Sequence, residues 1–197
     1  MSDVLSPLKG HNEARVPTGE AGVTLTERKL ISLVQVAAWP ETAEQVEGII
    51  ASLVGCAPPQ GPSGSSGGAG GAILALSPGR WLVESSDPRL AQQLCGQIPP
   101  ALGAVTDLSH ARIAIRIAGP KAAWVLAKGF ALDLHPEAFP PLKVAQSAAH
   151  EMGVILRRLG TESFDLYVYR GFALSFWEWL TEAAAETGYR VDPPGSA

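Results

Sequence analysis

The feature that most constrains the fold is an alternating strand pattern in the middle of the chain. Between Arg112 and Ile117, isoleucine alternates with arginine or alanine, so the isoleucines would share one face of a strand. A period of two is typical of a half-buried strand. Gly119 and Pro120 follow, and proline suits the first position of a helix because no amide hydrogen bond is lost there. The stretch 104–133 therefore predicts a strand, a short polar connection, a second strand and a helix.

The remaining patterns predict a mixed α+β protein. Before the central stretch we expect one long strand over 26–38, a helix ending near Gly55, a hairpin over 72–85 and a short helix opening at Asp87. After it we expect three strands, over 143–149, 154–159 and 163–169, and a last helix that begins at Gly171. The order strand, helix, two strands, helix, strand is that of a split β-α-β unit. The chain is thus predicted to form two packed, pseudo-repeated halves of this type.

Three segments carry no clear periodicity. Residues 1–23 are predicted to be a mobile tail or an extended arm, and residues 192–197 a polar tail. Residues 58–71, PPQGPSGSSGGAGG, predict a flexible Gly/Ser/Pro loop within a domain spanning 24–191. This loop lacks the strand-loop-helix context and the lysine that a phosphate-binding loop requires.

Composition and motifs argue against several classes of function. The net charge of −4 and the scattered basic residues give no footprint for nucleic acid. Cys56 and Cys95 form no CxxC pair, the four histidines have no metal-ligand spacing, and no dinucleotide fingerprint is present. No run of about 18 apolar residues predicts a membrane span. We therefore expect a soluble, cytoplasmic protein that binds no metal, FAD, FMN or NAD by itself.

Two groups of residues are candidates for function. Asp107, Ser109 and His110 are the densest cluster of chemically capable side chains, but no glycine elbow surrounds Ser109 and Asp107 is well placed simply to cap a turn, which favours a structural role. Trp177 and Trp179 cover more than one face of the last helix, and only 17% of residues are charged. Both observations suggest a surface covered by a partner. The alternatives are a buried terminal helix and a composition diluted by alanine and glycine.

Several stretches together resemble a known family. Asp107-Leu108-Ser109-His110, Gly119 and Asp133 resemble the D-x-S-H…G…D pattern of the folate-dependent aminomethyltransferase fold, the T-protein of glycine cleavage. Within that superfamily the chain looks most like the gamma subunit family of bacterial heterotetrameric sarcosine oxidase. The further matching stretches are 24–40, 76–85 and 163–180.

The resemblance implies a structural subunit rather than a catalyst. In that family FAD, FMN, NAD and tetrahydrofolate are held by partner subunits, and the partners are the alpha, beta and delta subunits. The complex oxidatively demethylates sarcosine to glycine, with hydrogen peroxide and either formaldehyde or 5,10-methylenetetrahydrofolate. A gamma subunit looks like a truncated aminomethyltransferase domain without its C-terminal barrel. We therefore expect no catalytic or cofactor-binding residue here, and at most a remnant pocket at Asp107, Ser109 and His110.

Two alternatives remain at this point. One is a free-standing, folate-binding enzyme similar to aminomethyltransferases. The other is the related folate-dependent protein that assists iron-sulfur enzymes, whose K-G-C-Y-x-G-Q-E signature is absent from this sequence.

Overall fold

The computed structural model describes residues 5–14 and 20–196 and divides into two compact units. The first unit comprises the described residues of 1–29, 111–141 and 146–197. The second comprises 30–110 and 142–145. Each unit is built on its own antiparallel or mixed sheet, in agreement with the predicted α+β class.

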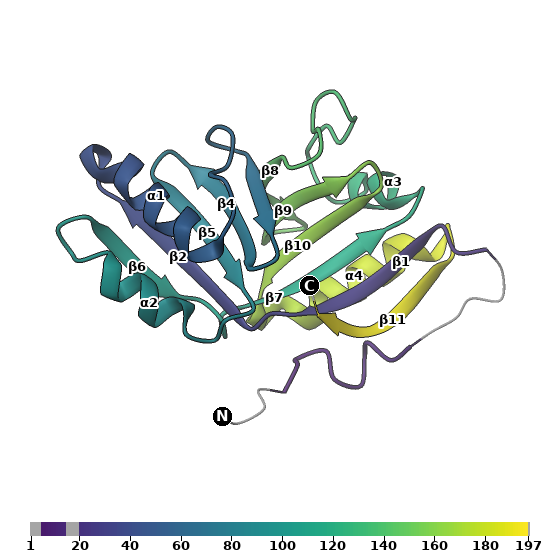
Figure 1. The fold of residues 1–197 in the computed structure, drawn as a ribbon. Coiled ribbons are helices and arrows are strands. Elements are labelled where there is room, and N and C mark those ends of the chain that lie inside the picture. Colours follow the sequence, from purple (N-terminus) through teal and green to yellow (C-terminus); the bar gives the residue numbers. More distant parts are fainter. Residues whose placement is uncertain (1–4, 15–19, 197) are drawn as a thin grey trace. The chain divides into compact units, whose positions relative to one another are not determined.

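The second unit is a five-stranded sheet with two helices on one face (Figure 1). Its elements are β2 (Ser32–Ala38), η1 (Pro40–Thr42), α1 (Ala43–Val54), β3 (Ser65–Gly68), β4 (Gly71–Ser77), β5 (Arg80–Ser85), α2 (Leu90–Gln97) and β6 (Gly103–Asp107). The strand order is β3-β4-β5-β2-β6. Branched aliphatic side chains from the strands meet the inner stripes of both helices in a buried core, which includes Val34, Val36, Val46, Ile50, Ile73, Val83 and Leu94.

The first unit is a six-stranded sheet in the order β11-β1-β7-β10-β9-β8. Its elements are β1 (Val23–Lys29), β7 (Arg112–Ala118), α3 (Ala122–Ala127), β8 (Val144–Ala149), β9 (Met152–Gly160), β10 (Ser163–Tyr169), η2 (Arg170–Phe172), α4 (Ala173–Ala185) and β11 (Tyr189–Ser196). The isoleucine face of β7 pairs in register with Phe164, Leu166 and Val168 of β10, and all of these side chains are buried. The helix α4 lies behind β1 and β7 in Figure 1.

The two units repeat one topology. The second unit follows β2-α1-β3-β4-β5-α2-β6, and the first follows β7-α3-β8-β9-β10-α4-β11. Both place their strands in the same sheet order, except that β1 is inserted between β11 and β7 in the first unit. Because β1 is antiparallel to β7, the final strand β11 runs parallel to β1. The predicted pseudo-repeat of split β-α-β type is confirmed. Each unit has three strands between its two helices, as expected for the second half of the chain and one more than expected for the first.

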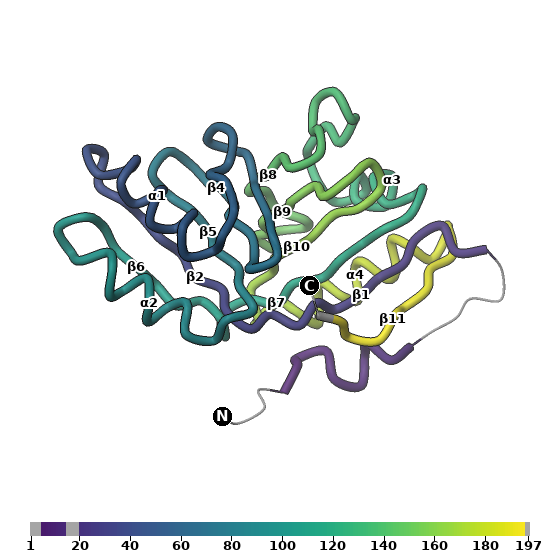
Figure 2. The backbone as a smooth tube through the Cα atoms, viewed as in Figure 1, coloured from purple at the N-terminus to yellow at the C-terminus, as the bar shows by residue number. Residues whose placement is uncertain are grey.

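The prediction of one long strand over 26–38 is wrong. It is two strands, β1 and β2, which belong to different sheets and are separated by a break at Leu30 and Ile31. The backbone trace in Figure 2 passes directly from one strand into the other. A continuous run of strand-forming residues hides such a break, because both strands satisfy the same local pattern.

Two segments expected to be irregular contain strands. Residues 65–68, inside the predicted loop 58–71, form β3 and pair with β4. Residues 192–196 of the predicted tail belong to β11 and pair with β1, with a register shift beside Pro193 and Pro194. Proline is tolerated at such an edge strand because its missing donor can face away from the ladder.

Of the predicted N-terminal arm, residues 5–14 dock on their own unit. The side chain of Leu8 is completely buried, and the backbone turns at 6–12 through hydrogen bonds between His11 and Leu8 and between Lys9 and Ser6. Residues 1–4 and 15–19 lie outside the described residues. The strand β1 begins at Val23, so the last residue assigned to the arm already belongs to the sheet.

Candidate functional site

The predicted polar cluster lies at the end of β6 and forms a tight turn. The Ser109 hydroxyl donates to Oδ1 of Asp107 at 2.6 Å, and the Ser109 amide donates to the same oxygen at 2.9 Å. The Ser109 oxygen also accepts a hydrogen bond from the Leu33 amide at 3.1 Å. The turn thereby fastens the end of β6 to the start of β2, which is the capping role that the sequence left open for Asp107.

The cluster is not arranged as a nucleophile and base. A hydroxyl is activated when its proton is directed at a basic group such as histidine. The proton of Ser109 is directed at Asp107 instead. Partial burial raises the pKa of Asp107, but the hydroxyl and amide of Ser109 and the neighbouring His110 outweigh it and lower the pKa below its ordinary value. The carboxylate is thus held ionised as a hydrogen-bond acceptor.

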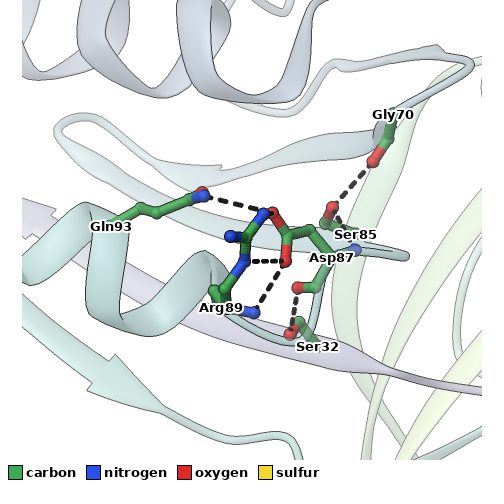
Figure 3. A network of polar contacts seen from close by, with 6 residues as sticks. All are labelled: Ser32, Gly70, Ser85, Asp87, Arg89 and Gln93. Carbon is green, nitrogen blue, oxygen red and sulfur yellow. Dashed lines mark hydrogen bonds and ion pairs between the residues drawn. The ribbon is translucent and has the colours of Figure 1, made fainter.

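A second polar network surrounds Asp87 (Figure 3). Its carboxylate accepts hydrogen bonds from the amide and guanidinium of Arg89 and from the side chain of Gln93, while its carbonyl accepts one from Ser32. Asp87 was expected to begin a helix. The helix α2 starts three residues later, at Leu90, and the carboxylate secures the connection before it. Both carboxylate oxygens and the carbonyl oxygen of Asp87 thus have partners from the same chain, which gives the network a structural role.

The two predicted interface tryptophans pack within the first unit. Trp177 is buried, and its indole Nε1 donates to the His11 carbonyl at 3.0 Å. Trp179 is half-buried and makes edge or tilted ring contacts with Phe130, His150 and Phe176. The Trp177 ring therefore holds the N-terminal segment. This arrangement corresponds to the alternative in which the last helix is buried within the chain.

Buried ions, which sequence reasoning missed, organise the first unit. Asp165 is fully buried and pairs with Arg28 at 2.9 Å and with Arg116 at 2.8 Å. These residues come from β10, β1 and β7, so one carboxylate joins three adjacent strands. The sequence offered only one indication of these ion pairs, namely that charged residues occupy alternating positions within these strands. The half-buried character expected for β7 is wrong, because Arg112 and Ala114 on its polar face are also buried.

Two cavities lie within the units, one in each, and neither is lined by Asp107, Ser109 or His110. One, in the first unit, has a volume of about 550 Å³ and is lined by Glu20, Lys121, Trp124, Glu186 and neighbouring residues. The other, in the second unit, has a volume of about 280 Å³ and is lined by α1 residues and Trp81. The remnant pocket at Asp107, Ser109 and His110 therefore stays a prediction.

Within residues 5–14 and 20–196, no group of three or more histidine, cysteine or acidic side chains could hold a metal ion. Over the same residues, no helix has both the length and the apolar character needed to cross a membrane.

Comparison with known proteins gives one consistent family. Residues 69–186 match the model of the sarcosine oxidase, gamma subunit family. The sarcosine oxidase subunit gamma of Corynebacterium sp. (strain U-96) is 30% identical over 88% of this chain and 85% of its own length. The corresponding subunit of Arthrobacter sp. is 31% identical over 92% of this chain and 90% of its own.

Solved structures agree with the sequence matches. A chain of the heterotetrameric sarcosine oxidase from Corynebacterium sp. U-96, solved in complex with pyrrole 2-carboxylate, superposes with a TM-score of 0.80 and 27% identity. The match covers 93% of this chain and 96% of that one. The glycine cleavage system aminomethyltransferase T from Bartonella henselae matches with a TM-score of 0.57 and 15% identity, over 82% of this chain and 46% of that one. The latter likeness shows a shared fold.

Proposed function

This chain belongs to the sarcosine oxidase gamma subunit family, and we propose that it serves as the gamma subunit of a heterotetrameric sarcosine oxidase. The observation that carries the proposal is the match of nearly the whole chain to nearly the whole of one chain in a heterotetramer. A match of this extent includes both units, so it supports an equivalent subunit rather than a shared domain. It favours this function over a free-standing, folate-binding enzyme.

We propose that the subunit itself is non-catalytic. The hydroxyl of Ser109, the one nucleophile in the predicted cluster, is engaged by Asp107 and by the Leu33 amide. His110 is exposed at the end of the turn, and the two cavities lie elsewhere. Activating Ser109 would require breaking the turn that joins β6 to β2. This arrangement supports a structural contribution to an oxidoreductase complex.

The proposed partners are the alpha, beta and delta subunits. In this proposal they hold FAD, FMN, NAD and tetrahydrofolate, and the complex converts sarcosine to glycine with hydrogen peroxide and either formaldehyde or 5,10-methylenetetrahydrofolate. Cytoplasmic assembly is part of the proposal. It is supported by Cys56 and the exposed Cys95, both free thiols, which persist most readily in a reducing compartment.

The test is affinity purification of the tagged chain from its native cell, followed by an absorbance spectrum of the eluate. Stoichiometric recovery of larger subunits, with flavin absorbance and sarcosine-dependent hydrogen peroxide formation, is the expected result. A colourless eluate that contains this chain alone and binds tetrahydrofolate would contradict the proposal and favour the free-standing enzyme.

A further inference from the structure

We propose that the outer face of α4 binds a basic surface of another subunit, one that presents lysine or arginine beside an apolar contact. The outer face is defined by the exposed residues Leu174, Ser175, Glu178, Glu182, Ala185 and Glu186. The inference rests on the proposed function, since it takes the partner to be a subunit of the same complex.

In the described part of the chain this face is exposed. Residues three and four apart share one side of a helix, so Leu174, Glu178 and Glu182 form a single row. The opposite side of α4 is buried in the first unit through Ala173, Phe176, Trp177, Leu180, Ala183 and Ala184. The buried side chains of the helix thus lie on its other side, and its outer face is exposed within the first unit.

Apolar groups mark both ends of the face. At the N-terminal end, Phe172 is 50% exposed and Leu174 is 36% exposed. At the C-terminal end, Glu186 lines the 550 Å³ cavity together with Trp124, which is 44% exposed. Aromatic side chains such as Phe172 and Trp124 are enriched in protein interfaces.

The charges between these ends indicate the partner's chemistry. Glu186 is already paired, because the Lys128 amine lies 3.0 Å from its carboxylate, 2.6 Å from the Ala183 carbonyl and 3.9 Å from the centre of the Trp124 ring. Glu178 and Glu182 form no ion pair with any residue in the described part of the chain. Like charges four residues apart repel each other on a helix. A basic partner would relieve this repulsion and complement the face.

A second copy of this chain fits the face poorly. A two-fold symmetric dimer through α4 would place the same patch against itself. Glu178 and Glu182 would then approach the same two carboxylates of the other copy. The charge pattern therefore favours a different polypeptide with basic groups.

The test reverses the charge of the face in the assembled complex. The tagged chain is co-expressed with the other subunits as wild type, as E178K/E182K and as E137K/E162K. The last is a matched control, since Glu137 and Glu162 are exposed, belong to the same unit and undergo the same change of charge. At about 0.15 M salt we expect E178K/E182K to recover the other subunits at least about tenfold less well, while the control resembles the wild type.

A second variant tests the apolar end. F172S/L174S removes two exposed apolar groups, so it should also weaken recovery while leaving the thermal unfolding midpoint of the isolated chain close to that of the wild type. Equal recovery of subunits by E178K/E182K and E137K/E162K would overturn the inference and leave the proposed function standing. Recovery of no other subunit by the wild type would instead overturn the proposed function.

Discussion

The Nε atom of Arg116 lies 2.8 Å from Oδ1 of Asp165, directly across the β7–β10 ladder. The other oxygen of the same buried carboxylate accepts a hydrogen bond from Arg28 in β1. An ion buried in this way is stable only while its partners remain. The carboxylate is therefore the point at which the centre of the six-stranded sheet is most sensitive to substitution.

We predict that Asp165→Ala lowers the free energy of unfolding by about 3–5 kcal/mol, because it leaves the buried Arg28 guanidinium without this counter-ion. Arg116→Ala should cost only about 1 kcal/mol, since the side chain of Arg116 is 35% exposed and Arg28 still pairs with Asp165. Denaturant unfolding of both variants measures the difference. Equal losses for the two variants would contradict this account.

The second prediction concerns Arg158. Its guanidinium is buried and donates to the backbone carbonyls of Leu134, Phe139, Gly160 and Thr161. Desolvation by burial lowers its pKa below the ordinary value. Lysine cannot reproduce this planar set of donors, so Arg158→Lys should destabilise the protein by about 2–4 kcal/mol.

The same substitution should free the segment 134–139, and hydrogen exchange would detect faster exchange there than in the wild type. Arg80→Lys is the matched control, since Arg80 is exposed. Unchanged exchange at 134–139 in Arg158→Lys would show that the guanidinium does not hold this segment.

Local patterns predicted most of the secondary structure but not which strands meet. The alternation in β7 and β10 placed Arg116 and Asp165 at polar positions of their strands. Their pairing depends on the sheet order, which brings together residues 49 positions apart in the sequence. For the same reason, the polar face of β7 was expected to be solvated, although Arg112 is buried and the side chain of Arg116 is only 35% exposed.

The candidate site was likewise only partly predictable from the sequence. The turn at Asp107 and Ser109 was predictable, because Asp-x-Ser forms its hydrogen bonds within three residues. The hydrogen bond of the Trp177 indole was not, since its acceptor is the carbonyl of His11, which lies 166 residues away. The strand β11 was also hidden, because adjacent prolines normally indicate a loop unless the strand lies at a sheet edge.

Glu27 should make stability depend on pH. Burial raises its pKa above the ordinary value of 4.5, while hydrogen bonds from Ser6 and Asn12 and the charge of Arg170 partly oppose the shift. The folded protein thus binds this proton more tightly than the unfolded chain does. The stability contribution of Glu27 is therefore largest below its ordinary pKa and is lost as the pH rises through the raised value.

The measurement is the difference in unfolding free energy between the wild type and Glu27→Gln, from about pH 4 to about pH 7. We expect the wild type to lose stability relative to Glu27→Gln as the pH rises, because glutamine has no proton to lose. Glu41→Gln, at an exposed position, is the matched control. An increase in the relative stability of the wild type with pH would show that its partners outweigh burial at Glu27.

Substitutions in the polar cluster at the end of β6 can distinguish a structural from a catalytic role. Ser109→Ala removes the bonds to Asp107 and Leu33, so it should lower the unfolding free energy by about 1–2 kcal/mol. His110→Ala should leave stability unchanged, since this side chain is exposed. If the subunit is non-catalytic, complexes assembled with either variant should keep the kcat for sarcosine of the wild type. General acid–base catalysis contributes about 10²–10⁴-fold, so a loss of that size in a fully assembled complex would assign chemistry to this chain.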